Sequence, residues 1–201
     1  MSVLSRPHVT PEEYLEQERK APYKSQYYRG ESFPMVGASF AHNTIAVNIA
    51  SELRVRLKNK PQRVSQSDTR VFVPEAGLFT YPDVVVAPAE LKFHDSETDT
   101  LLNPLVIVEV LSRSTEGYDR GRKFEHYRRI DSLQDYVLVS QAKPSIEVYS
   151  RQSNGTWRLS HTKGIESTIE IPSIECTLPL AEVYHKVELR PEEEVPDPQS
   201  R

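Results

Sequence analysis

The chain of 201 residues contains 37% hydrophobic and 27% charged side chains and carries a formal net charge of −4, a composition typical of one globular domain rather than a disordered chain. Cys176 is the single cysteine, which excludes a disulfide framework and a multi-cysteine zinc site. No apolar run approaches the length of a membrane helix and the N-terminus lacks the apolar segment of a signal peptide, so we expect a cytoplasmic protein without membrane contacts.

Helices are predicted over residues 10–18, 40–58 and 116–129, and a short fourth helix from about residue 177. The first begins with a capping box at Thr10, and the second has an apolar residue at every fourth position. A polar loop is expected at 87–103, and strands at 26–29, 31–36, 63–67, 70–73, 78–86, 105–111, 135–140, 145–150, 156–161 and 168–171. This order predicts an α/β (α+β mixed) fold with a central mixed β-sheet flanked by helices.

Charge is distributed unevenly along the chain. Residues 188–201 are rich in glutamate and proline, and we expect them to form a disordered tail after a single domain at 1–187. Basic side chains gather at 51–63 and 111–130. These segments offer positive surface for phosphate groups, or they are simply solvated helix faces.

Glu109 conflicts with its surroundings. It lies in the apolar run LVIVEVL (residues 105–111), which is typical of a strand covered on both faces, and it shares one face with Ile107 and Leu111. Burying an isolated carboxylate is costly unless it is paired, hydrogen-bonded or bound to a cation. Glu109 is therefore a candidate site residue. The alternatives are a pair with a buried Arg or Lys, or a position facing water at a sheet edge.

A second carboxylate, Asp83, lies in a comparable place, between Pro82 and the apolar run Val84–Val86. Proline cannot donate to a sheet ladder, so it marks a strand start or a bulge, and bulges often direct a side chain into a site. If the two strands are antiparallel neighbours, Asp83 projects beside Glu109. Two such carboxylates make a hard oxygen site for Mg²⁺ or Mn²⁺. The alternative is a turn-forming Pro-Asp pair.

Lys123 lies on the third predicted helix, on one face with Asp119 and Tyr127. That face is partly inward, so the ammonium group could reach the strand ends. A lysine beside a metal site stabilises developing charge on a phosphate or helps to activate the attacking water. The alternative is an exposed ion pair between Asp119 and Lys123.

The strings YPDVVV, LVIVEVLSRSTEGYDRGRKFEHYRRI and DYVLVS resemble the Uma-type restriction endonuclease family, a domain of unknown function in the PD-(D/E)xK nuclease superfamily. The strings TPEEYLEQE, QYYRGESFPMVGAS and HNTIAVNIASELRVRL extend the resemblance to about residues 10–187. It implies a restriction-endonuclease-like core with the site at one sheet edge. It makes Asp83 and Glu109 the motif acids and the Val110 carbonyl a further metal ligand. The classical lysine position holds Leu111, and the family's shifted lysine matches Lys123.

This sequence departs from the family pattern Glu-Tyr-x-x-Gly-Glu, because Gln26 stands where the first glutamate is usual, while Glu31 is retained. A glutamine oxygen is neutral and binds a metal more weakly, which implies lower metal affinity or lost activity. The family also shows a histidine at the place of His42. Its role could be phosphate contact or orientation of the site, or it could be a packed histidine near a helix start.

Two main functions remain open at this point. The first is an Mg²⁺- or Mn²⁺-dependent endonuclease that hydrolyses phosphodiester bonds in DNA with Asp83, Glu109 and Lys123. The second is a catalytically impaired nuclease fold that binds DNA or another protein. In a third interpretation Glu109 is a structural ion-pair partner, bonded to an arginine far from Asp83. A homodimer would suit cleavage of both strands of a duplex.

Overall fold

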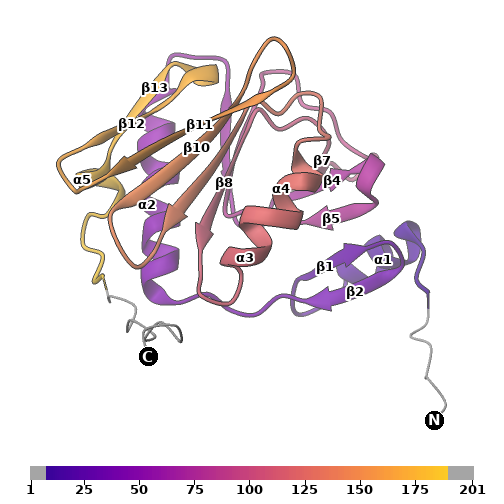
Figure 1. The fold of residues 1–201 in the computed structure, drawn as a ribbon. Helices are drawn as coiled ribbons and strands as arrows, with labels where there is room; N and C mark the ends of the chain where they lie inside the picture. The colour runs from indigo at the N-terminus through magenta and orange to yellow at the C-terminus, as the bar shows by residue number, and fades with distance from the viewer. Residues whose placement is uncertain (1–7, 190–201) are drawn as a thin grey trace, which may run out of the picture.

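The computed structural model describes residues 8–189 (Figure 1). The helices are α1 (Pro11–Glu18), α2 (Phe40–Arg56), α3 (Glu116–Tyr118), α4 (Phe124–Tyr127) and α5 (Leu180–Val183), with short turns η1 (Pro74–Ala76), η2 (Asp119–Lys123) and η3 (Pro172–Ile174). The strands are β1 (Ser25–Tyr28), β2 (Glu31–Pro34), β3 (Arg63–Gln66), β4 (Arg70–Val73), β5 (Leu78–Thr80), β6 (Val84–Ala87), β7 (Thr100–Leu101), β8 (Val106–Leu111), β9 (Asp135–Ser140), β10 (Ser145–Arg151), β11 (Trp157–Lys163), β12 (Thr168–Ile171) and β13 (Cys176–Pro179).

The strands form a six-stranded mixed sheet in the order β11-β10-β9-β8-β6-β3, a five-stranded sheet in the order β2-β1-β5-β4-β7, and the pair β12-β13. The prediction of a mixed sheet flanked by helices is confirmed by the six-stranded sheet. The sequence did not predict that the N-terminal strands form a sheet of their own.

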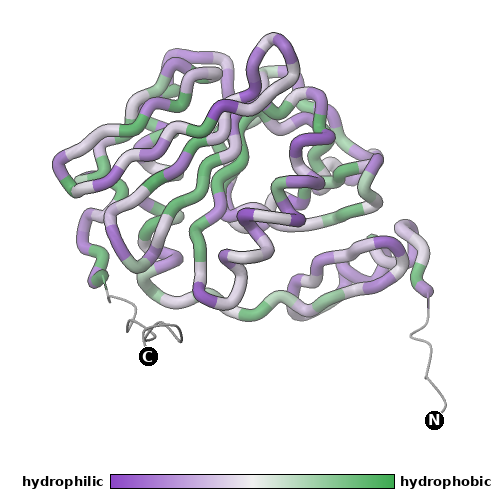
Figure 2. Tube along the Cα trace, viewed as in Figure 1, coloured by the Kyte–Doolittle hydropathy of each residue, from purple (hydrophilic) through white to green (hydrophobic). Residues whose placement is uncertain are grey.

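Strand β8 lies inside the six-stranded sheet, antiparallel to β6 and parallel to β9, and all of its residues are buried. Figure 2 shows hydrophobic residues following this part of the sheet through the interior. The strand predicted at residues 105–111 is therefore confirmed, and it is not an edge strand. A charged side chain on it must find its partners inside the protein.

Helices cover both faces of this sheet. On one face, Ile45 and Ile49 of α2 join Val108 in an apolar cluster. On the other, Tyr127 of α4 packs with Ile107, so the side chains of β8 alternate between two cores. Glu109 follows the period of Ile107 and projects to the side of α4.

The five-stranded sheet carries α1, the helix predicted at residues 10–18. The Thr10 capping box is present, and Tyr14 stacks on Tyr27 of β1 with ring centroids 5.0 Å apart. The Tyr81 hydroxyl donates to a Glu18 oxygen at 2.9 Å, which ties α1 to the segment between the two large sheets. These contacts fix β1, the strand that carries Gln26.

The continuous strand predicted over residues 78–86 is wrong. β5 ends at Thr80 and β6 begins at Val84, and they belong to different sheets. Pro82 has no N–H for a ladder bond, so pairing stops there and the chain passes from one sheet to the other. Asp83 is the last residue of this crossing.

The helix predicted over residues 116–129 is confirmed as helical backbone from Glu116 to Tyr127, but it is not α-helical throughout. α3 and α4 are separated by η2, a π-helical turn over Asp119–Lys123. In a π-turn the hydrogen bond spans five residues instead of four, so an extra residue is accommodated, and such turns are frequent at functional sites. Thr115 is the N-cap residue of α3, although its side chain makes no capping bond, and the Ser112 hydroxyl accepts the backbone N–H of Thr115.

Two smaller differences remain. Strand β7 and the bridge between Phe93 and Leu101 lie in the predicted loop at 87–103. Strand β13 occupies the predicted start of the last helix, which begins only at Leu180. The tail predicted at 188–201 lies outside the described residues from 190 onward. Between residues 8 and 189, no helix is both long enough and apolar enough to cross a membrane.

Candidate metal and phosphate site

The candidate residues Asp83 and Glu109 lie opposite one another within the six-stranded sheet, where β6 begins. The register pairs Val84 with Val108 in antiparallel strands, so Asp83, one residue before β6, lies opposite Glu109 of β8. The amino end of α2 reaches the same place through His42. The predicted neighbourhood of the two strands is confirmed.

The Asp83 carboxylate is held by two donors. The His42 Nε2 donates to its Oδ1 at 2.9 Å, and the backbone N–H of Val110 donates to its Oδ2 at 2.8 Å. His42 is therefore not merely a packed histidine, because it orients the carboxylate. The bond from Val110 also shows that the backbone of this residue is directed toward Asp83. The N–H and C=O of one strand residue lie on the same side, so the Val110 carbonyl is directed there too.

Glu109 is 4% exposed. Its Oε1 accepts a hydrogen bond from the Tyr127 hydroxyl at 2.9 Å and lies 2.9 Å from the Lys123 Nζ. Burial raises the pKa of Glu109 to about 8; the ammonium of Lys123 opposes this shift, and the charges of Asp83 and Asp119 add to it. The alternative that Glu109 pairs with a buried Arg or Lys is therefore met. The partner is Lys123, itself a candidate site residue, and Asp83 lies opposite Glu109.

Lys123 is 7% exposed, and its Nζ also lies 3.2 Å from Asp119 Oδ1, so the alternative of an exposed ion pair is wrong. Burial acts to lower the pKa of Lys123, but the carboxylates of Glu109 and Asp119 outweigh it and raise the pKa. The Tyr136 hydroxyl donates to the backbone carbonyl of Asp119 at 3.0 Å. This bond fixes the π-turn that directs both charged side chains inward.

Gln26 lies on the far side of the π-turn, on β1 of the other sheet. Its Nε2 donates to the Tyr118 hydroxyl at 2.8 Å, and its Oε1 accepts from the Thr80 hydroxyl at 3.2 Å. Gln26 thus connects the two sheets through α3. Glu31 lies at the exposed start of β2, opposite Tyr28, and the structure does not place it beside the Asp83 and Glu109 carboxylates.

The residues fit a hydrated divalent cation. Among residues 8–189, no group of three or more His, Cys, Asp or Glu side chains is placed to hold a metal ion. Mg²⁺, however, is usually bound by one or two carboxylates and keeps several waters. Asp83, Glu109 and the Val110 carbonyl supply hard oxygen ligands of this kind. The single ammonium of Lys123 pairs with both Glu109 and Asp119, and a cation would add positive charge beside Asp83.

Two contacts were not predicted from the sequence. The Tyr127 hydroxyl donates to Glu109, and the Tyr118 hydroxyl accepts from Gln26. The signal for Tyr127 was available, because it follows Lys123 by four residues on one helix face. No local signal identifies Tyr118, since its partner belongs to another sheet.

Residues 11–181 match the Uma2 family, described as "Putative restriction endonuclease". The uncharacterised Synechocystis protein sll1609 is 35% identical over 85% of this chain and 96% of its own length, and slr1290 of the same organism is 32% identical over 89% and 92%. A crystal structure from Anabaena variabilis, described as "a putative nuclease belonging to DUF820", has a TM-score of 0.68 at 17% identity and covers 88% of this chain and 97% of that one. The structural likeness shows a common fold. Because the family match spans most of the chain, this protein belongs to the Uma2 family.

Proposed function

We propose that this protein is a metal-dependent endonuclease that uses Mg²⁺ or Mn²⁺ to hydrolyse phosphodiester bonds in DNA. One observation carries the proposal: the buried residue Glu109 lies opposite Asp83 where β6 begins, and the Lys123 Nζ lies 2.9 Å from the Glu109 carboxylate. Family membership supports nuclease activity.

The proposed ligands are the carboxylates of Asp83 and Glu109 and the carbonyl of Val110. A divalent ion bound there polarises the scissile phosphate and lowers the pKa of a bound water. The protein's own groups supply the rest. His42 holds Asp83 in place, and Tyr127 holds Glu109. The Lys123 ammonium stabilises negative charge that develops on the phosphate.

The remaining assignments follow from this proposal. DNA is the substrate, and a cytoplasmic location would give access to it. A homodimer related by a two-fold axis would present two sites to the two strands of a duplex.

The test compares wild-type protein with Glu109→Gln in cleavage of plasmid and single-stranded DNA, with Mn²⁺ or Mg²⁺ and with a chelator. We expect cleavage that requires metal and is lost in the variant. Glu18→Gln is the matched control, because Glu18 is also a buried carboxylate bonded to a tyrosine hydroxyl, in another part of the fold. Metal binding measured by calorimetry gives an independent result. Equal Mn²⁺ binding by wild type and Glu109→Gln would refute the ligand assignment.

A further inference from the structure

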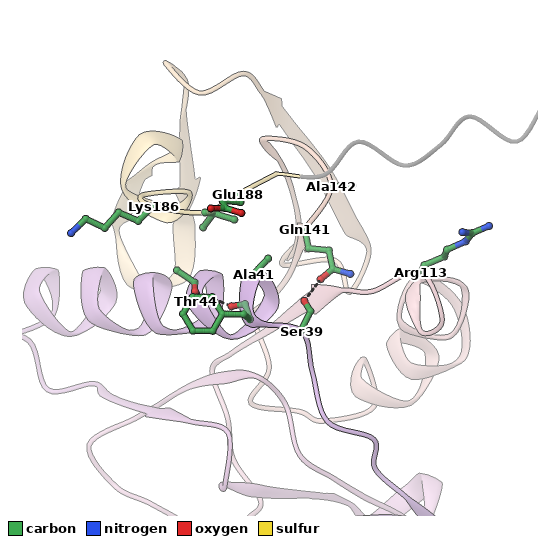
Figure 3. Close-up of a pocket in the computed structure, with 10 residues that line it drawn as sticks. Ser39, Ala41, Thr44, Arg113, Gln141, Ala142, Lys186 and Glu188 are labelled. Carbon is green, nitrogen blue, oxygen red and sulfur yellow. Dashed lines mark hydrogen bonds between the residues drawn. The ribbon is translucent and has the colours of Figure 1, made fainter.

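A pocket of about 490 Å³ lies between the amino end of α2, the loop after β9 and the segment after α5 (Figure 3). Its walls include Ser39 and Phe40 at the start of α2, Gln141 after β9, and Ala142. The volume is in the range of clefts that hold organic ligands. The proposed metal ligands and Lys123 do not line this pocket, so it is separate from the candidate metal site.

The pocket adjoins the candidate site through two chain segments. Ala41 lines the pocket and directly precedes His42, the residue that holds Asp83. Arg113 lines it from the loop that continues β8, four residues after Glu109. If the scissile phosphate of a DNA strand binds at Asp83 and Glu109, the next nucleotide of that strand therefore lies within reach of the pocket.

The pocket carries groups that suit a nucleobase. Phe40 is 87% exposed, although a phenylalanine at this place gains nothing from contact with water. The Oε1 of Gln141 accepts a hydrogen bond from the Ser39 hydroxyl at 3.0 Å, and its Nε2 makes no bond to any residue from 8 to 189. An aromatic ring stacks on any base, and an amide reads the edge of a base.

Charged residues lie around the pocket. Figure 3 shows Arg113 and Lys186 at opposite ends, with both side chains extending outward, and Glu188 between them. Two cations and one anion leave this rim positive. Arg113 and Lys186 are thus placed to contact phosphates of the strand on either side of a base.

We propose that this pocket binds one unpaired nucleotide of single-stranded or frayed DNA, next to the phosphate that is cleaved. The inference rests on the proposed function and extends it to the substrate class. In a duplex both faces of a base are stacked, so the ring of Phe40 has no face to contact. An unpaired base offers its face to Phe40 and its edge to Gln141.

The test measures binding rather than cleavage. Fluorescence anisotropy of a labelled single strand and of the matched duplex is recorded with Ca²⁺ or with a chelator. Phe40→Ala and Gln141→Ala are compared with Val55→Ala, which removes another exposed side chain of α2 far along the helix. Loss of one stacked base predicts about 5- to 150-fold weaker single-strand binding by Phe40→Ala. Duplex binding changes less than about twofold, and Phe40→Trp retains wild-type affinity for the single strand.

Single-strand binding that is the same in Phe40→Ala and Val55→Ala would overturn the inference. So would wild-type protein that binds duplex alone, or equal losses on both DNA forms. The outcome is independent of the nuclease test. If wild type cleaves DNA with metal but Phe40→Ala binds single strands normally, the proposed function stands and the pocket plays no part in it. If Phe40→Ala loses single-strand binding but wild type does not cleave DNA, the pocket assignment stands and the proposed function is refuted.

Discussion

Replacing Lys123 with methionine removes the ammonium group that lies between the buried carboxylates of Glu109 and Asp119. Removal of one partner from a buried ion pair costs about 3–5 kcal/mol, because the other charge stays buried without compensation. A domain of this size loses about 2–4 °C in Tm for each kcal/mol, so the metal-free variant should melt about 6–20 °C below wild type. Thermal unfolding followed by circular dichroism in the presence of a chelator measures this difference.

Lys20→Met is the matched control. Lys20 also pairs with an acid four residues earlier in the chain, Glu16 of α1, at 2.7 Å, but its side chain is 72% exposed. Exposed pairs contribute little to stability, so this variant should melt close to the wild-type Tm. If Lys123→Met lowered Tm no more than Lys20→Met, the compensating role of the buried ammonium would be refuted.

The same variant tests where the metal binds. In wild type the ammonium occupies one side of Glu109, and in Lys123→Met a divalent cation can take over the compensation of charge. Mn²⁺ at about 100 times its Kd stabilises a protein by about 2.7 kcal/mol, or about 5–11 °C here. We expect the Tm of Lys123→Met to rise by at least this amount, and by more than that of wild type at the same Mn²⁺ concentration. The variant should nevertheless no longer cleave DNA. A smaller gain than in wild type would place the metal away from Glu109.

Three further predictions concern the surroundings of the site and the N-terminal network. Gln26→Glu adds a carboxylate beside the π-turn and should tighten Mn²⁺ binding; an unchanged Kd in calorimetry would show that this position does not sense the metal. His42→Gln keeps a side chain that can donate to Asp83 but loses the ring geometry, and cleavage should fall about 10- to 100-fold with little change in Tm. The Arg19 guanidinium holds the pKa of Asp99 below its usual value. The unfolded chain therefore takes up this proton first as the pH falls, and stability is lost below about pH 4, a loss that Asp99→Asn should reduce in acid titrations of Tm.

Sequence reasoning identified Asp83 and Glu109 because each is a carboxylate in a run that is otherwise apolar. The cost of burying charge makes such a residue visible without any structure. Their proximity followed from strand alternation and from an antiparallel pair, both of which have fixed geometry. Lys123 was identified from its helix face, but its burial depends on contacts with β8 that no local pattern contains.

The features that were missed depend on long-range packing. The π-turn over Asp119–Lys123 uses residues that also suit an α-helix, and it is held by Tyr136 from β9. The break between β5 and β6 was indicated by Pro82, yet the assignment of the two halves to different sheets depends on partners elsewhere in the chain. The position of Gln26 against Tyr118 likewise requires the docking of one sheet on a helix of the other.

The charges around Glu109 favour a nuclease over a module that only binds DNA. The ammonium of Lys123 pairs with the carboxylates of Glu109 and Asp119, and the negative charges of Asp83 and Asp119 help to raise the pKa of Glu109. Such a cluster repels phosphate, so a protein selected for DNA binding alone would gain stability and affinity by replacing these acids with apolar residues. A bound divalent cation would turn this repulsion into attraction, because it would neutralise the carboxylates and attract the phosphate. The proposed metal-dependent chemistry would thus explain a carboxylate at Glu109 in a fully covered strand.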